Sequence, residues 1–318
     1  MKPSELKRAL TSAVAAARAA GDVMRRNLNA HKIVNEAARH DIKLELDVRC
    51  QRLIERQLRT DFPDLPILGE EGLVGNPDAE LRWVVDPIDG TVNFAYDVPH
   101  ACTCIALQAR DPQAKPTGFR SIVGVTYDPF LDEMFTATAG TPARLNGRVL
   151  HVSTRTKVAD SLVATGFSKS RANMAMSVPY AAELALRSRK IRMMGSAGTM
   201  LAYVAAGRFD AYVELSISIW DFASGALLIE QAGGAFWCEP GLEPATWRMV
   251  ADNGRLRKKL PPLPRLPDHC HLVKPSAGAP ALALALTLNP ILSAPKQITI
   301  KSRSKSKRRA PPTPFRLN

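Results

Sequence analysis

The first part of the chain carries apolar residues at every third or fourth position, which is the spacing of one face of an amphipathic helix. Leu6, Leu10 and Val14 begin this series. The pattern predicts a helix over residues 4–28. Apolar residues four positions apart return after Asp47 and predict a second helix there, which a Phe-Pro-Asp sequence ends.

The middle of the chain changes from helical spacing to short apolar runs separated by turn signals such as Asp-Pro and Asn-Gly. Strands are predicted at residues 66–68, 82–85, 102–107, 121–127 and 133–138. After residue 160, helices and strands alternate. The pattern there predicts a helix at 197–206, a strand at 210–215 and a helix at 222–231, with glycines closing both helices. Helices mixed with both kinds of strand indicate a layered α/β or α+β protein.

Residues 86–91 read Asp-Pro-Ile-Asp-Gly-Thr and follow the predicted strand at 82–85. That strand delivers Asp86 to the edge of a sheet. We expect the strand to end at Asp86, because Pro87 cannot continue the pairing and keeps the preceding residue extended. Asp89 then lies one turn further along and can face the same point as Asp86.

These six residues suit a divalent cation beside a phosphate. Carboxylate and carbonyl oxygens, with no His or Cys nearby in the sequence, favour Mg²⁺ over zinc. Gly90 lets the backbone approach a ligand closely. Thr91 offers a hydroxyl and an N–H where a helix can start, which suits an anion. Taken alone, the motif is equally compatible with a capped turn between a strand and a helix that binds nothing.

Further acidic residues strengthen the metal interpretation. Glu70 and Glu71 follow a short predicted strand and lie between glycines, and Asp221 follows Trp220 at a predicted helix start. A single acid of this kind is commonly a solvated charge, and Asp221 by itself is most simply an N-cap. Acids at several strand ends and helix starts together indicate a shared site.

The motifs Gly69-Glu70-Glu71, the run from Trp83 to Phe94 and the run from Trp220 to Gly225 with Ala232-Gly233-Gly234 occur in order along the chain. Together they resemble the inositol monophosphatase family over roughly residues 4–260. The resemblance implies a layered αβαβα sugar-phosphatase fold with mixed sheets. We expect an inositol monophosphatase-like catalytic domain over residues 1–262 and a basic, proline-rich, disordered tail over 263–318.

The resemblance also implies roles for individual residues. Two or three Mg²⁺ ions would be held by Glu70, Asp86, Asp89, Asp221 and the carbonyl of Ile88. Asp47 and Thr91 would orient and deprotonate the attacking water. Substrate contacts would come from Gly90, Thr91, Gly195, Ser196, Ala197, Glu214 and Asp221, with Asp41 as a supporting acid near the metals. From their own positions alone, Glu214 and Gly195 are also compatible with a strand-end acid and a helix-start glycine.

The chain departs from the family pattern at specific positions. Leu44 stands where the family usually has a small hydroxyl residue before Asp47. The substitution is expected to weaken hydrogen bonding around Asp47. Ser224 replaces a usual alanine, and the segment after residue 261 has no counterpart in the short ending typical of the family.

The predicted function is Mg²⁺-dependent hydrolysis of a phosphomonoester. Phosphate monoesters hydrolyse very slowly in water, and paired metal ions stabilise the charge of the transition state, so the predicted ligand set suits this reaction. The favoured substrate is inositol monophosphate, with inhibition by Li⁺. Fructose 1,6-bisphosphate, histidinol phosphate and phosphoadenosine phosphate remain alternatives, since the sequence does not name the alcohol. Homodimers are common in the family, although nothing in the sequence specifies one.

The charge of the chain is concentrated at one end. The net charge is +13, but fourteen Lys and Arg residues and a single acid lie from Arg255 onward, which leaves the preceding body neutral. A solvated extension without function is the favoured interpretation of this segment, and weak contact of the basic run at 296–317 with nucleic acid or an acidic partner is the alternative. The five cysteines lack CxxC spacing and are expected to be free thiols. We expect a cytoplasmic protein with no membrane span, since no apolar run is long enough.

Overall fold

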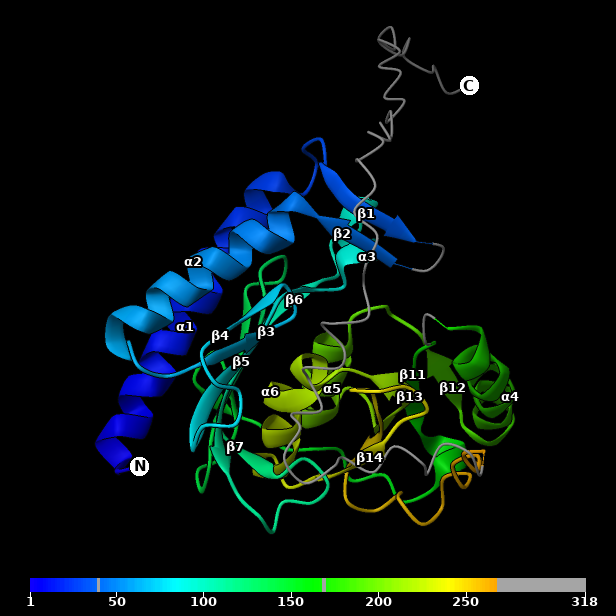
Figure 1. Cartoon of the computed structure of the whole chain (residues 1–318). Helices are drawn as coiled ribbons and strands as arrows, with labels where there is room; N and C mark the ends of the chain where they lie inside the picture. Colours follow the sequence, from blue (N-terminus) through cyan, green and yellow to red (C-terminus); the bar gives the residue numbers. More distant parts are fainter. Residues whose placement is uncertain (39–40, 168–169, 268–318) are drawn as a thin grey trace, which may run out of the picture.

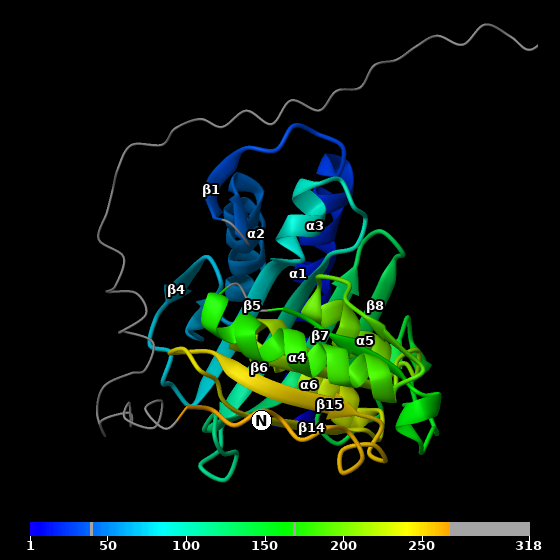
Figure 2. The ribbon, with the colours of Figure 1, turned by 90° about the vertical axis from the view of Figure 1, so that its right-hand side faces the viewer.

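The computed structural model describes residues 1–38, 41–167 and 170–267, without the side chains of residues 36–43. Its helices and sheets alternate in five layers (Figure 1, Figure 2). From one side to the other these are α1 (Pro3–Asn27) with α2 (Glu45–Asp61), an eight-stranded sheet, α5 (Ala197–Ala205) with α6 (Ile219–Gln231), a five-stranded sheet, and α4 (Arg171–Arg187). The predicted layered αβαβα fold with mixed sheets is confirmed.

The eight-stranded sheet has the order β10-β9-β8-β7-β6-β5-β3-β4. Only β3 and β5 pair in parallel within it. Its strands are β3 (Ile67–Gly69), β4 (Gly72–Val74), β5 (Leu81–Asp89), β6 (Cys102–Arg110), β7 (Phe119–Asp128), β8 (Glu133–Thr138), β9 (Arg144–Leu145) and β10 (Arg148–Val149). The parallel pair places the end of β3 beside the end of β5, which brings two of the predicted acidic motifs together.

The five-stranded sheet has the order β12-β11-β13-β15-β14 and is also mixed, because β11 pairs in parallel with both of its neighbours. Its strands are β11 (Leu162–Thr165), β12 (Lys190–Arg192), β13 (Ala211–Ile217), β14 (Ala235–Pro240) and β15 (Trp247–Asp252). Helices α5 and α6 contact both sheets, so the residues at their N-terminal ends are positioned by both.

Several elements were not predicted from the pattern of apolar residues. The hairpin of β1 (Val34–Ala38) and β2 (Asp41–Leu44) precedes α2, and a short 3-10 helix spans Val158–Asp160. Helix α4 contains Pro179 in its interior, where proline ordinarily breaks a helix. Tertiary packing outweighs the local signal here, since Tyr180 and Leu184 are buried against the five-stranded sheet.

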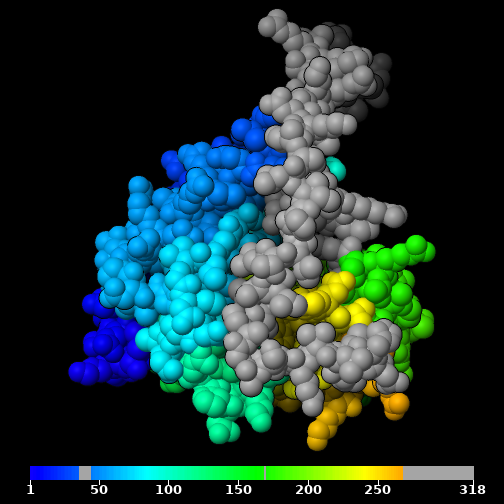
Figure 3. Space-filling model, in the orientation of Figure 1, coloured from blue at the N-terminus to red at the C-terminus, as the bar shows by residue number. Residues whose placement is uncertain are grey.

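Apolar side chains fill the spaces between the layers in three clusters. One lies between α1, α2 and the first sheet around Trp83, a second lies between the two sheets around Leu201, and a third lies under α4 around Val213. In the space-filling view the N-terminal helices and the α4 region occupy opposite sides of the molecule (Figure 3). Among the described helices, none combines the length and apolar character needed to cross a bilayer.

Strand β5 does not end at Asp86 as predicted; it continues to Asp89 through Pro87. Asp86 pairs with Cys104 and Asp89 pairs with Cys102, so three steps on β5 match two steps on β6. The extra residue on β5 forms a β-bulge. Pro87 has no N–H, and within a bulge this costs the sheet no hydrogen bond between the strands. Residues three apart normally face opposite sides of a strand, and the bulge turns Asp86 and Asp89 to the same side.

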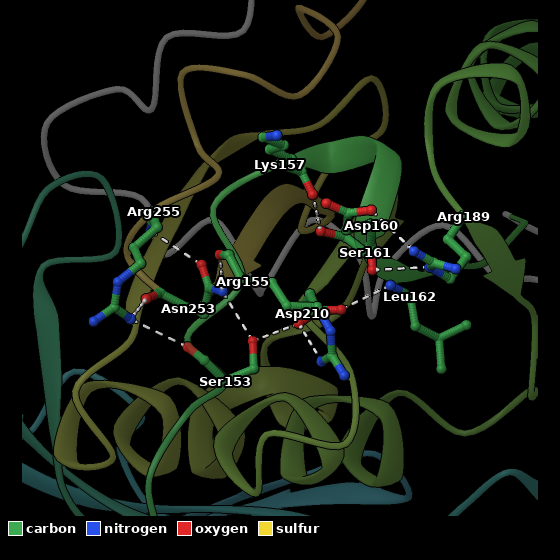
Figure 4. A network of polar contacts seen from close by, with 10 residues as sticks. All are labelled: Ser153, Arg155, Lys157, Asp160, Ser161, Leu162, Arg189, Asp210, Asn253 and Arg255. Carbon is green, nitrogen blue, oxygen red and sulfur yellow. Dashed lines mark hydrogen bonds and ion pairs between the residues drawn. The ribbon is translucent and has the colours of Figure 1, made fainter.

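A buried polar network ties the second sheet to the segments around it (Figure 4). Asp210 is fully buried and accepts hydrogen bonds from Ser153 Oγ, from Arg155 Nη1 at 3.0 Å and from the Leu162 backbone N–H at 2.7 Å. Asn253 Nδ2 donates to Ser153 Oγ at 2.9 Å and to the carbonyl of Arg155 at 2.8 Å. The network fixes the starts of β11 and β13 relative to the turn after β15.

Candidate active site

The start of α2 positions the first candidate catalytic residue. The helix begins at Glu45 rather than after Asp47 as predicted, so Asp47 lies in its first turn, three residues after the N-cap Leu44. The Leu44 backbone N–H donates to Asp47 Oδ2 at 2.7 Å. Thr91 Oγ1 lies 3.3 Å from Asp47 Oδ1 and donates to the carbonyl of Ile88 at 2.8 Å. The leucine side chain provides no cap, but the backbone still orients Asp47.

Burial raises the pKa of Asp47 to about 8. The nearby charges of Glu70 and Glu71 act in the same direction, while the hydrogen bonds from Leu44 and Thr91 oppose it. A carboxylate with a raised pKa beside a hydroxyl can accept a proton near neutral pH.

The three aspartates of the predicted metal site converge. Carboxylate oxygens of Asp86, Asp89 and Asp221 lie within 4.8 Å of one another. Asp221 comes from the first turn of α6, where it is not the N-cap: Ser218 holds that position, and its backbone N–H donates to Asp221 Oδ2 at 2.9 Å. The end of β3 adds Glu70, whose backbone N–H donates to the Val85 carbonyl at 3.1 Å.

Asp86 is the least compensated member of this cluster. Its side chain is 1% exposed, and no donor among the described residues reaches Oδ1. Burial raises its pKa well above the ordinary value, and the charges of Glu70, Asp89 and Asp221 add to the effect. Converging buried carboxylates with an unpartnered oxygen are the donor set that a hard divalent cation such as Mg²⁺ requires. The residues present therefore fit the expected metal.

Asp89 also faces the N-terminal end of α5. Its carboxylate accepts hydrogen bonds from Ser196 Oγ at 2.6 Å and from the backbone N–H groups of Ala197 at 3.0 Å and Gly198 at 2.6 Å. These bonds and the helix dipole stabilise its negative charge, although burial still raises its pKa. Ser196 and Ala197, which were predicted as substrate contacts, thus contact Asp89 directly.

Two cysteines that the sequence analysis treated only as free thiols also reach Asp89. Cys102 Sγ lies 3.4 Å from Asp89 Oδ2 and 3.7 Å from Cys104 Sγ. The sequence next to the motif holds no cysteine, but the fold brings Cys102 and Cys104 close to it. Cross-strand pairing between β5 and β6 produces this proximity, and no spacing within the motif signals it.

The loop before α5 approaches the turn at Gly90. A Cβ added to Gly90 would lie 3.0 Å from the His100 carbonyl and 3.2 Å from the Gly195 carbonyl, and Gly90 has a φ of +94°. Asn93 Nδ2 links the same segments by donating to the carbonyls of His100 and Met194, both at 2.8 Å. Asn93 was not predicted to have a site role, although it belongs to the quoted motif.

Glu214 lies on β13, buried, and accepts a hydrogen bond from the Tyr212 hydroxyl at 2.7 Å. Burial raises its pKa to about 7, and this hydrogen bond opposes the shift. Gly166 makes room for the carboxylate, since a Cβ there would clash with it. The neighbouring negative charge of Asp89 contributes to the raised pKa, which relates Glu214 electrostatically to the acidic cluster.

Another residue that sequence reasoning missed supports the acidic turn after β3. Gln51, buried on α2, accepts a hydrogen bond from the Glu71 backbone N–H at 2.8 Å. A helical glutamine offers no signal for such a role in the sequence. The side chain of Asp41, predicted as a supporting acid, lies outside the described side chains.

Comparisons with known proteins agree with this geometry. Residues 5–260 match the inositol monophosphatase family. The chain is 39% identical to Nus factor SuhB of Xylella fastidiosa, over 72% of this chain and 81% of that protein. It is 33% identical to inositol monophosphatase 1 of Solanum lycopersicum, over 80% of this chain and 93% of that protein. The crystal structure of extragenic suppressor protein SuhB from Bartonella henselae superposes with a TM-score of 0.70 at 31% identity, covering 79% of this chain and 95% of that one. The chain belongs to the inositol monophosphatase family.

Proposed function

We propose that this protein is a Mg²⁺-dependent phosphomonoesterase that acts on inositol monophosphate or a similar small polyol phosphate. The observation that carries the proposal is the convergence of Asp86, Asp89 and Asp221, with an unpartnered Asp86 oxygen. The pair formed by Asp47 and Thr91 adjoins the Ile88 carbonyl in the same motif. Family membership supports a phosphatase reaction.

In this proposal the metal ligands are Glu70, Asp86, Asp89, Asp221 and the Ile88 carbonyl, as the resemblance implied. When bound, Mg²⁺ supplies positive charge to the phosphate oxygens and lowers the pKa of a bound water. Five oxygen donors of this kind are compatible with more than one ion.

The chain's own residues would handle the proton of the attacking water. Thr91 Oγ1 donates to the Ile88 carbonyl and can accept a hydrogen bond from water. Asp47 would then take up that proton directly, or the Thr91 hydroxyl would receive it while its own proton, turned from the Ile88 carbonyl, passes to Asp47 Oδ1. The backbone N–H groups of Gly90 and Thr91 would bind the phosphate, with the glycine allowing close approach.

Recognition of the alcohol would fall to the second sheet and the loop before α5. Glu214 can accept a hydrogen bond from a substrate hydroxyl, and Gly195, Ser196 and Ala197 border the same region. A carboxylate at this place favours a polyol over an apolar alcohol. Fructose 1,6-bisphosphate, histidinol phosphate and phosphoadenosine phosphate are the alternative substrates.

The proposal is tested by initial rates on these four phosphates side by side, with Mg²⁺ and with or without Li⁺. We expect the highest kcat/KM for inositol 1-phosphate and inhibition by Li⁺. Asp89→Asn should remove most turnover while the protein stays folded, and the exposed Asp64→Asn serves as the matched control. Inactivity of the wild type on the whole panel, or near-normal kcat in Asp89→Asn, would contradict the proposal.

A second candidate function is regulatory binding through the basic tail. It is supported by the excess of positive charge after residue 254 and by the name Nus factor that a 39% identical relative carries. RNA binding that falls steeply with salt and disappears on deletion of residues 268–318 would support it. This deletion keeps Leu263 and Pro264, which contact the body of the protein. RNA binding that persists after deletion would exclude the tail.

A further inference from the structure

Asp89 belongs to two groups of metal-ligating atoms. One is the carboxylate cluster with Asp86 and Asp221, and the other consists of Asp89, Cys102 and Cys104, whose ligand atoms also lie within 4.8 Å of one another. All three side chains of the second group are buried. The two thiols lie on the same face of β6, because they are two residues apart.

Two distances in the second group match those around a tetrahedral thiophilic ion. With Zn–S bonds of about 2.3 Å and a Zn–O bond of about 2.0 Å, a tetrahedral angle separates two sulfurs by about 3.8 Å and a sulfur from an oxygen by about 3.5 Å. The observed separations are 3.7 Å between Cys102 Sγ and Cys104 Sγ and 3.4 Å between Cys102 Sγ and Asp89 Oδ2. These two separations agree with the edges of such a tetrahedron, and Cys104 Sγ lies within 4.8 Å of the Asp89 carboxylate.

A hydroxyl lies beside two of these ligand atoms. Ser196 Oγ is 3.6 Å from Cys102 Sγ and 2.6 Å from Asp89 Oδ2. It can orient a water that completes the coordination of the ion. Gly198 closes the other side, where any side chain would collide with Cys104 Sγ.

We propose that Cys102, Cys104 and Asp89 form a binding site for one thiophilic divalent cation, represented by Zn²⁺. The ion replaces the two thiol protons, which are released to solvent, and gains two thiolates and one carboxylate as ligands. Soft sulfur ligands select such an ion against Mg²⁺. Because Asp89 serves both groups, the ion inhibits the Mg²⁺-dependent reaction; this consequence alone rests on the proposed function.

A disulfide between the same cysteines is geometrically unfavourable. Two residues along a strand span about 6.6 Å at about 3.3 Å per residue. This lies at the upper limit of the Cα separation that a disulfide tolerates, which is about 6.8 Å. A buried pair of thiols that binds no ion is the other alternative, and the following experiment separates all three.

The primary test is X-ray absorption at the zinc edge on the full-length protein loaded with one equivalent of Zn²⁺. We expect two sulfur neighbours at about 2.3 Å. A spectrum with only oxygen and nitrogen neighbours would overturn the proposal, and so would recovery of the two cysteines as a disulfide from freshly reduced protein. This measurement requires neither a variant nor a substrate.

A second test uses Cd²⁺ and its thiolate charge-transfer absorption in the ultraviolet. Cys102→Ala and Cys104→Ser should each weaken Cd²⁺ binding at least tenfold and reduce the absorption. Cys50→Ala, which removes a buried thiol on α2 outside this group, should leave both unchanged. Equal Cd²⁺ affinity in all three variants would overturn the proposal.

If the wild type hydrolyses inositol 1-phosphate, Zn²⁺ should inhibit this reaction at least tenfold less strongly in Cys104→Ser than in the wild type. A protein without phosphatase activity would still pass or fail the spectroscopic tests.

Discussion

The hydroxyl of Thr91 lies 3.3 Å from Oδ1 of Asp47, although 44 positions separate the two residues in the chain. The contact joins the first turn of α2 to the start of α3 (Thr91–Ala95). Thr91 Oγ1 also donates to the Ile88 carbonyl at 2.8 Å. A single hydroxyl therefore connects the candidate general base with a candidate metal ligand.

This connection predicts how substitutions at Asp47 and Thr91 affect turnover. Asp47→Asn and Thr91→Val should each lower kcat about 10²- to 10⁴-fold, the range expected for loss of general-base catalysis. Thr91→Ser keeps the hydroxyl and should retain most of the activity. Steady-state kinetics on inositol 1-phosphate at saturating Mg²⁺ measure the effect. Equal activity of the Val and Ser variants would show that the hydroxyl has no catalytic part.

The buried carboxylate of Asp86, whose Oδ1 has no donor among the described residues, should destabilise the protein when no cation is bound. Asp86→Asn removes that charge, so at pH 8 with a chelator the variant should unfold at a higher temperature than the wild type. Mg²⁺ should raise the unfolding temperature of the wild type, since a ligand at 100 times its Kd stabilises by about 2.7 kcal/mol, and should do so much less for the variant. Thermal melts with chelator and with Mg²⁺ provide both comparisons. A wild type indifferent to Mg²⁺ would contradict the assignment.

Glu214 should make stability depend on pH. Its pKa rises from 4.5 to about 7 in the folded state, so the folded protein keeps a proton that the unfolded chain releases. Stability should therefore fall as pH rises from about 4.5 to about 7 and change little above that. Glu214→Gln should be more stable than the wild type at pH 8 by up to about 3 kcal/mol, with no advantage near pH 4. Urea unfolding in the presence of a chelator tests this difference.

The exposed Glu80→Gln is the matched control for that experiment, because the side chain of Glu80 is 86% exposed. It should leave the slope of stability against pH unchanged. Other buried acids contribute their own pH dependence to both proteins, so the difference between wild type and Glu214→Gln isolates Glu214. An identical decline in those two proteins would refute the prediction.

The network around Asp210 predicts a purely structural effect (Figure 4). Asp210→Ala leaves the Leu162 N–H and the Ser153 hydroxyl without their acceptor in a buried place. The free energy of unfolding should fall by about 2–4 kcal/mol. Asp160→Ala is the control within the same network: its pair with Arg189 is half exposed on both sides, so the cost should stay below about 1 kcal/mol. Chemical denaturation measures the free energy of unfolding of both variants. An equal loss of stability in the two would count against the prediction.

Periodicity predicted the long elements well. The helix expected at 4–28 is α1, and the strand expected at 133–138 matches β8. In these segments the apolar residues follow either the spacing of one helix face or the alternation of a strand, so the element can be read from the segment itself. Helix α4 and strands β14 and β15 were missed as individual elements because their patterns are weak and long-range packing stabilises them. The tail at 268–318, including the basic run, lies outside the described residues.

By itself, the sequence determined which residues could form a metal site, because a motif places Asp86, Ile88 and Asp89 within four consecutive positions. The tertiary structure decided how they meet. The bulge at Pro87 turns both aspartates to one face, and α5 brings Ser196 to Asp89 from 107 positions away. Cross-strand pairing sets the two thiols against the same carboxylate. Spacing along the chain encodes local geometry, whereas contacts between layers depend on register and packing that no single segment contains.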